Sequence, residues 1–126
     1  MSETCRISID NKAVTVKTGT TVFDACVGLG IQIPTLCLNR DLSLFESCMV
    51  CTVRDRSSGQ TLPSCAALVR EGMDIDASSE EVRALRKSAV ELLLSEHTGD
   101  CEAPCTRGCP VDTRIPELLQ IGRASC

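Results

Sequence analysis

Apolar and polar residues alternate in two short segments at the start of the chain. Ile7 and Ile9 stand between polar neighbours, and the first segment ends at Asp10. After a short polar turn, Val14 and Val16 repeat the alternation. A period of two on both sides of a tight turn predicts a β-hairpin whose apolar side chains face the core.

A helical period follows the hairpin. Thr20 or Thr21 can cap a helix that ends near Gly28 and Gly30. Its apolar face carries Val22, Ala25, Cys26 and Leu29. Beyond a long loop, a strand is predicted at residues 51–55 and a turn at 57–59; the segment 62–65 follows, and a last short strand is predicted at 73–76. This order predicts an α+β fold, in which a small sheet packs on one helix.

A second helix is predicted from about Glu80 to Glu96. Ser78 and Glu81 stand at capping-box spacing just at its start. Arginine and lysine at 83, 86 and 87 alternate with glutamates and predict a solvated face. The apolar stripe of this helix comprises Val82, Leu85, Ala89, Leu92 and Leu93. We therefore expect two parts, residues 1–78 as a compact domain and residues 79–126 as a helix with a cysteine-rich tail.

Charge and composition narrow the class of protein. Thirteen basic and 17 acidic residues give a formal net charge of −4 over 126 residues, which disfavours a nucleic-acid partner. No apolar run is long enough to predict a membrane span, and the N-terminus does not resemble a secretory signal. Ten cysteines without a secretory signal indicate metal ligation in a reducing compartment. A cytoplasmic metalloprotein is expected.

Four cysteines form the most informative motif. Their spacing is C-x10-C-x2-C-x13-C, made by Cys37, Cys48, Cys51 and Cys65. A zinc ribbon needs two C-x2-C pairs, whereas a [2Fe-2S] cluster needs two thiolates on each of two irons. The spacing favours an iron–sulfur site, and buried or disulfide-paired cysteines or a zinc site stay open as alternatives. Cys5 and Cys26 share faces with apolar residues and are expected to be small core residues.

The residues around these cysteines resemble a known family. The segments PTLC at 34–37, ESCMVCTV at 46–53, PSC at 63–65 and EGM at 71–73 resemble the ferredoxin domain that opens the large iron–sulfur subunit of complex I. NAD-linked hydrogenases and formate dehydrogenases carry similar domains. The resemblance covers roughly residues 4–96 and implies a β-grasp ferredoxin-like fold with a [2Fe-2S] cluster on Cys37, Cys48, Cys51 and Cys65. Such domains often have Gly and Arg where this chain has Ser47 and Met49.

A second cysteine-rich segment follows the second helix. His97, Cys101, Cys105 and Cys109 are each four residues apart, and another cysteine stands at Cys126. The His–Cys spacing is similar to that of complex I. DCEAPC at 100–105 and GCPVDTRIP at 108–116 resemble the iron–sulfur entry segment of glutamate-synthase small-subunit-type oxidoreductases. This resemblance implies a [4Fe-4S] cluster on Cys101, Cys105 and Cys109, completed by His97 or Cys126; zinc, an incomplete site or disulfides are the alternatives.

These observations predict an electron-transfer module of an NAD(P)H-linked oxidoreductase. Such a module needs no catalytic site, because the redox chemistry belongs to the cofactor. By resemblance, its partner is a flavoprotein or another NAD(P)H-oxidising subunit or domain. Two other functions are compatible with the sequence: a redox or iron sensor that responds to cluster loss, and an interaction module stabilised by zinc.

Overall fold

The computed structural model describes residues 4–43, 46–96 and 107–111. By their internal contacts, Met1–Ser95 form one compact unit and Glu96–Cys126 a second. The first unit holds all the strands of the described residues and their two longer helices. The division that the sequence predicts after residue 78 stays a prediction.

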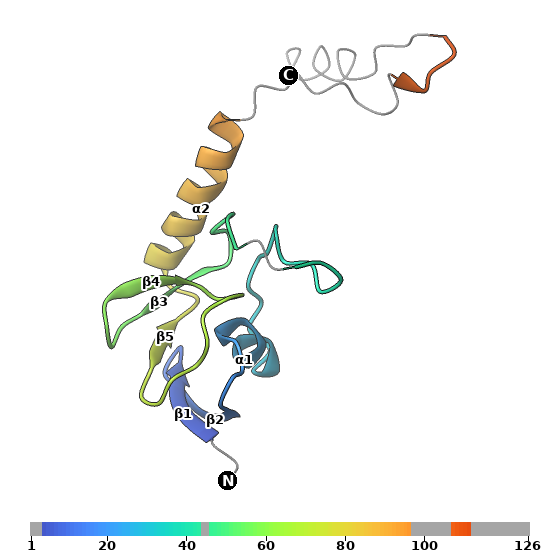
Figure 1. Cartoon of the computed structure of the whole chain (residues 1–126). Coiled ribbons are helices and arrows are strands. Elements are labelled where there is room, and N and C mark those ends of the chain that lie inside the picture. Colours follow the sequence, from blue (N-terminus) through green and yellow to red (C-terminus); the bar gives the residue numbers. More distant parts are fainter. Residues whose placement is uncertain (1–3, 44–45, 97–106, 112–126) are drawn as a thin grey trace. The chain divides into compact units, whose positions relative to one another are not determined.

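One mixed sheet forms the frame of the first unit (Figure 1). The strand order is β2-β1-β5-β3-β4. Strands β1 and β5 pair in parallel, and the other neighbours are antiparallel. The predicted α+β, ferredoxin-like class is confirmed. The strands are β1 (Thr4–Ile9), β2 (Lys12–Lys17), β3 (Thr52–Asp55), β4 (Gln60–Pro63) and β5 (Asp74–Asp76).

The first hairpin has the register that the alternation predicts. Ile9 pairs with Lys12, so only Asp10 and Asn11 form the turn. Both have left-handed φ angles, 48° and 66°. A two-residue turn of this kind matches the twist of the strands, and Asp and Asn tolerate the left-handed region. The Asp10 carboxylate also accepts hydrogen bonds from Ala77 N at 2.8 Å and Ser78 Oγ at 2.6 Å.

Helix α1 (Val22–Gly28) packs on the sheet as predicted. Thr21 caps it, with Oγ1 accepting from Asp24 N at 3.1 Å. The apolar face is buried in a single core with side chains from β1, β3 and β5. Cys5 and Cys26 are both buried in that core, which confirms the expectation for these two residues. The fully buried large side chains of this core are Ile9, Val22, Val53 and Ile75, with Cys26 beside them.

Helix α2 (Glu80–Ser95) differs from the sequence expectation in what it buries. Val82 is fully buried, but Leu92 and Leu93 near its end are exposed. Arg86, expected on a solvated face, is buried at 9% exposure. Figure 1 shows the reason: α2 starts beside β3 and β4 and then extends beyond the sheet, so only its first turns have a surface to cover. Within the described chain, no helix is long and apolar enough to cross a membrane.

Candidate metal centre

Two of the four predicted ligands lie at the same end of the β3–β4 hairpin. Cys51 immediately precedes β3, and Cys65 follows the end of β4 by two residues. Thr52 pairs with Pro63 in the antiparallel register, so the chain enters β3 where it leaves β4. The sheet pairing therefore brings Cys51 and Cys65 close together although 13 residues separate them in sequence.

The loop before β3 has a tight turn within the C-x2-C pair. Met49 has a left-handed φ of 55°, and its carbonyl accepts from Thr52 N at 3.2 Å and Thr52 Oγ1 at 2.6 Å. Glu46 is also left-handed, with a φ of 47°. Related domains often have a glycine at the position of Ser47. In this chain the left-handed residues are Glu46, just before Ser47, and Met49, two residues after it. The loop thereby turns its backbone N–H groups without a glycine.

Three of the four thiols are buried. Cys48, Cys51 and Cys65 are 6%, 2% and 4% exposed, and Cys37 is half-buried. None of these four, nor Cys5 or Cys26, forms a disulfide. The four candidate ligands are therefore free thiols, and Cys37 is the one most accessible to solvent.

The pKa shifts show how strongly these thiols interact. Burial alone raises the pKa of Cys48, but hydrogen bonds from the backbone of Val50, Cys37 and Leu36 outweigh it, and the net pKa is lowered. Burial raises the pKa of Cys65 to about 12, with further contributions from the charges of Cys51, Cys37 and Cys48. The charges of the other three cysteines thus disfavour ionisation of Cys65, and a cation is needed to hold Cys65 as a thiolate beside them.

The four free thiols match the number of thiolates that a two-iron cluster needs. Among residues 4–43, 46–96 and 107–111, no three or more His, Cys, Asp or Glu side chains converge as they would on one metal ion. A [2Fe-2S] cluster divides four thiolates between two irons and spreads them over a wider site. Backbone N–H groups aimed at the Cys48 sulfur are also typical donors to cluster thiolates.

Ser64 links the ligand segments to each other and to α1. Its hydroxyl, fully buried, donates to the main-chain oxygen of Cys51 at 2.7 Å. Its own main-chain oxygen accepts from Phe23 N, in the first turn of α1, at 2.9 Å. Ser64 is not among the residues predicted from the sequence, where its only signal is its place next to Cys65.

Arg86 is a second residue of this site that the sequence does not predict. Its Nε donates to the main-chain oxygen of Thr52 at 2.9 Å. Because Thr52 follows Cys51 in the chain, the positively charged Arg86 side chain is hydrogen-bonded to the residue next to a candidate ligand. A signal is present in the sequence, because Arg86 is four residues after Val82 and shares its helix face.

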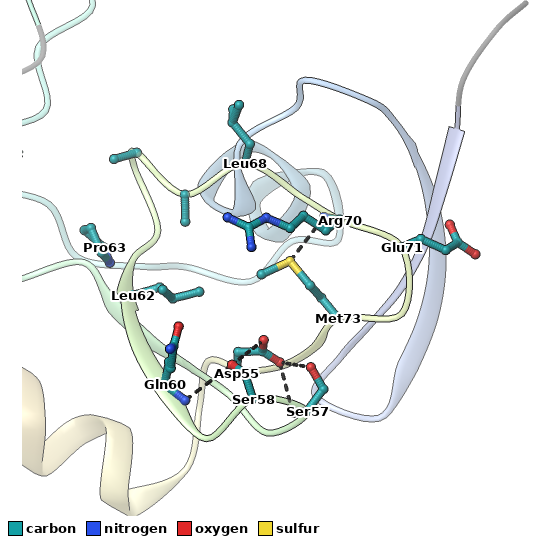
Figure 2. Close-up of a pocket in the computed structure, with 12 residues that line it drawn as sticks. Asp55, Ser57, Ser58, Gln60, Leu62, Pro63, Leu68, Arg70, Glu71 and Met73 are labelled. Atoms are coloured by element: carbon teal, nitrogen blue, oxygen red, sulfur yellow. Dashed lines mark hydrogen bonds between the residues drawn. The ribbon is translucent and has the colours of Figure 1, made fainter.

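Two hollows lie near the hairpin, and only one involves a candidate ligand. A cavity of about 280 Å³ is lined by Cys65 together with Phe23 and Leu38. A larger cavity of about 440 Å³ has no cysteine in its lining. Figure 2 shows this larger cavity, where Asp55 accepts from the hydroxyls of Ser57 and Ser58 at 2.6 and 2.8 Å. Asp55 and the two serine hydroxyls thus satisfy each other in this hollow.

The second predicted site lies largely outside the described residues. His97, Cys101, Cys105 and Cys126 belong to segments that the structure does not describe. Cys109 is described and half-buried. The [4Fe-4S] interpretation therefore stays a prediction.

Comparison with known proteins agrees with this geometry. A family model for the 2Fe-2S iron-sulfur cluster binding domain matches residues 2–80. The NADPH-Fe(3+) oxidoreductase subunit alpha of Geobacter sulfurreducens is 36% identical over 95 residues, covering 75% of this chain and 11% of the relative. The NADH-ubiquinone oxidoreductase 75 kDa subunit of Reclinomonas americana is 34% identical over 102 residues, covering 81% of this chain and 15% of the relative.

A solved structure supports the same assignment of fold. The crystal structure of an NAD+-reducing [NiFe]-hydrogenase in the H2-reduced state matches with a TM-score of 0.62 and 26% identity. The match covers 77% of this chain and 44% of the hydrogenase chain. The matches thus span 11% and 15% of the two relatives and less than half of the hydrogenase chain.

Proposed function

We propose, from the premise that the chain belongs to the 2Fe-2S iron–sulfur cluster binding domain family, that Cys37, Cys48, Cys51 and Cys65 bind one [2Fe-2S] cluster. The observation that carries the proposal is the pairing of β3 with β4, which brings Cys51 and Cys65 to one end of the hairpin, where both are buried free thiols. Each iron would take two of these thiolates.

The cluster makes this chain an electron-transfer module. When bound, a [2Fe-2S] cluster accepts and releases single electrons. The protein supplies the four ligands and buries three of them. Cys37 is half-buried, so it is the ligand nearest to solvent. Homology to subunits of NAD(P)H-linked oxidoreductases supports a place in such a complex. Its partner would be a flavoprotein or another NAD(P)H-oxidising subunit, in the cytoplasm.

A second cluster would extend the electron path. Cys101, Cys105 and Cys109 would supply three ligands of a [4Fe-4S] cluster, with His97 or Cys126 as the fourth. The support is the spacing of these residues and the resemblance of residues 100–116 to other iron–sulfur proteins.

The first experiment measures iron, sulfide and low-temperature EPR on anaerobically purified protein reduced with dithionite. A [2Fe-2S] cluster gives about two irons and one reduced spin system per chain. We expect Cys65→Ala to lose this signal and Cys26→Ala, which removes an equally buried thiol, to keep it. A colourless protein that contains zinc would contradict the proposal and favour the interaction module.

The second cluster has its own test. About six irons per chain and a second EPR signal are expected if both clusters form. His97→Ala and Cys126→Ser then identify the fourth ligand, because only one of them should lower the iron content. About two irons in the wild-type chain would contradict the second cluster and leave the first intact.

The electron-transfer role is tested separately from cluster binding. The iron-loaded protein should be reduced by NAD(P)H in the presence of an NAD(P)H-oxidising flavoprotein, as followed by bleaching of the visible absorption. A cluster that stays oxidised under these conditions, but whose loss changes partner binding, would favour the sensor function.

A further inference from the structure

Arg86 is the one arginine of α2 that the fold removes from water. It is 9% exposed, whereas the side chain of Arg83 on the same helix is 69% exposed and lies near Glu80. Its Nε–H is satisfied by the main-chain oxygen of Thr52, but Nη2 is buried and has no hydrogen-bond partner in the part of the chain that the structure describes. A buried guanidinium without a full set of acceptors is costly unless negative charge lies close by.

Four negatively chargeable groups act on this guanidinium. Burial lowers the pKa of Arg86, and the charges of Cys51, Cys26, Asp10 and Asp76, in decreasing order, oppose that shift. An arginine nevertheless stays protonated in proteins. The buried cation is therefore permanent, and Cys51 is its strongest charge partner.

Two of these four groups are paired with another cation or carry no charge. The carboxylate of Asp10 is bound by Ala77 N and Ser78 Oγ, which are neutral donors and do not cancel its charge. Asp76 is bound by Arg56 and Ser79 N. Burial raises the pKa of Cys26 to about 11, so this thiol is neutral at pH 7. Asp10 and, as a thiolate ligand, Cys51 are the charges left to face Arg86, and Cys51 acts on it more strongly.

We propose that Arg86 raises the reduction potential of the [2Fe-2S] cluster by placing a buried positive charge behind its ligand Cys51. This inference rests on the proposed function, because it requires Cys51 to be a ligand. Two ferric ions, two sulfides and four thiolates carry a net negative charge, and one added electron makes it more negative. A nearby buried cation stabilises the reduced form more than the oxidised form, with little screening by water.

The charge must be separated from the hydrogen bond to Thr52. Arg86→Lys keeps the charge but changes the donor geometry. Arg86→Gln keeps a donor without the charge, and Arg86→Met keeps the side-chain volume with neither. Arg83→Gln is the matched control, because it removes the same charge from an exposed position of α2.

The measurement is a redox titration of the iron-loaded variants, followed by EPR and visible absorption at low and high salt. At the midpoint potential of the wild type, the ratio of reduced to oxidised cluster should fall about tenfold in Arg86→Gln and Arg86→Met, a size set by a buried charge at an effective dielectric constant of about 20. Arg86→Lys should stay near the wild type and Arg83→Gln should equal it. High salt should leave the Arg86 effect in place.

Each other outcome has a defined meaning. Iron loss from both neutral variants but not from Arg86→Lys supports the charge role, because the cation is then needed to hold the cluster at all. An unchanged potential in an iron-loaded Arg86→Gln overturns the inference, as does an equal fall in Arg86→Lys, which would assign the effect to the hydrogen bond. Iron loss from all three variants also overturns it. A wild-type chain without a [2Fe-2S] signal refutes the proposed function instead.

Discussion

Ser64 donates from its fully buried hydroxyl to the main-chain oxygen of Cys51, 2.7 Å away. Ser64 is next to the candidate ligand Cys65, so this bond connects the segments that carry Cys51 and Cys65 where the chain enters β3 and leaves β4. Ser64→Ala leaves a buried carbonyl with only a longer backbone contact, Ser64 N at 3.3 Å. We expect it to lower the free energy of unfolding by about 1–3 kcal/mol. Urea denaturation of the iron-loaded protein measures this change.

Ser95→Ala is the control for Ser64. Its hydroxyl donates to the Leu92 oxygen in the exposed last turn of α2. Water replaces that bond, so the stability should stay within about 0.5 kcal/mol of the wild type. Equal effects of the two substitutions would contradict the role assigned to Ser64.

Met49 tests whether the left-handed turn of the cysteine loop matters for holding the cluster. Its φ is 55°, a region that a β-branched residue rarely adopts. Met49→Val should therefore distort the turn between Cys48 and Cys51 and speed the loss of iron to a chelator severalfold. Met49→Gly accepts the same φ without strain and should release iron no faster than the wild type. Faster release from the glycine variant than from the valine variant would refute this explanation.

Asp10 connects the first hairpin to the segment that leads from β5 into α2. Asp10→Ala removes the acceptor of Ala77 N and Ser78 Oγ and puts alanine at the left-handed φ of 48°, and these two changes together should lower the free energy of unfolding by about 1–3 kcal/mol. Thermal unfolding monitored by circular dichroism reports it as a lower Tm. Asp41→Ala, at an exposed loop position, is the control and should leave Tm unchanged. An unchanged Tm in Asp10→Ala would show that this connection adds no stability.

Because the pKa of the Cys26 thiol is raised in the folded protein, we expect the free energy of unfolding to fall at alkaline pH. Burial, helped by the charge of Asp10 and opposed by that of Arg86, raises the pKa of this thiol from 9.0 to about 11. The folded state thus binds this proton more tightly than the unfolded state. Its contribution is complete below pH 9 and is lost as the pH rises towards 11, with a slope of at most about 1.4 kcal/mol per pH unit.

The measurement is urea denaturation at several pH values between about 8 and about 11, for the wild type and Cys26→Ala. The variant has no thiol at this position, so its stability should fall less steeply over the same range. Parallel pH profiles for the two proteins would contradict the shift.

Local patterns in the sequence predict most of the frame. The hairpin follows from the alternation around Ile7 and Val14, and α1 from the cap at Thr21 and the apolar face around Cys26. These elements are decided by residues close to each other in sequence, which is why the prediction succeeds. The order of the strands in the sheet did not follow from such patterns, because the pairing of β1 with β5 joins residues more than 60 positions apart.

The surroundings of the cysteines were harder to predict than the cysteines themselves. Spacing and neighbouring segments indicate the four candidate ligands. Arg86 looked like part of a charged, solvated face, since its neighbours Arg83 and Lys87 are solvated. Its place four residues after Val82 puts it on the buried face of α2, but the depth of its burial depends on where α2 meets β3, which is a tertiary contact. Ser64 is likewise defined by a bond across the hairpin.

The place of β5 between β1 and β3 has a consequence for the order in which the molecule is made. All four candidate ligands lie between β1 and β5 in sequence, so they have all been synthesised before the strand that joins the two halves of the sheet. Closing that long loop costs chain entropy. A cluster bound to the four cysteines inside this loop would reduce that entropy cost, as a cross-link does. Cofactor insertion and completion of the sheet would then favour each other during biogenesis.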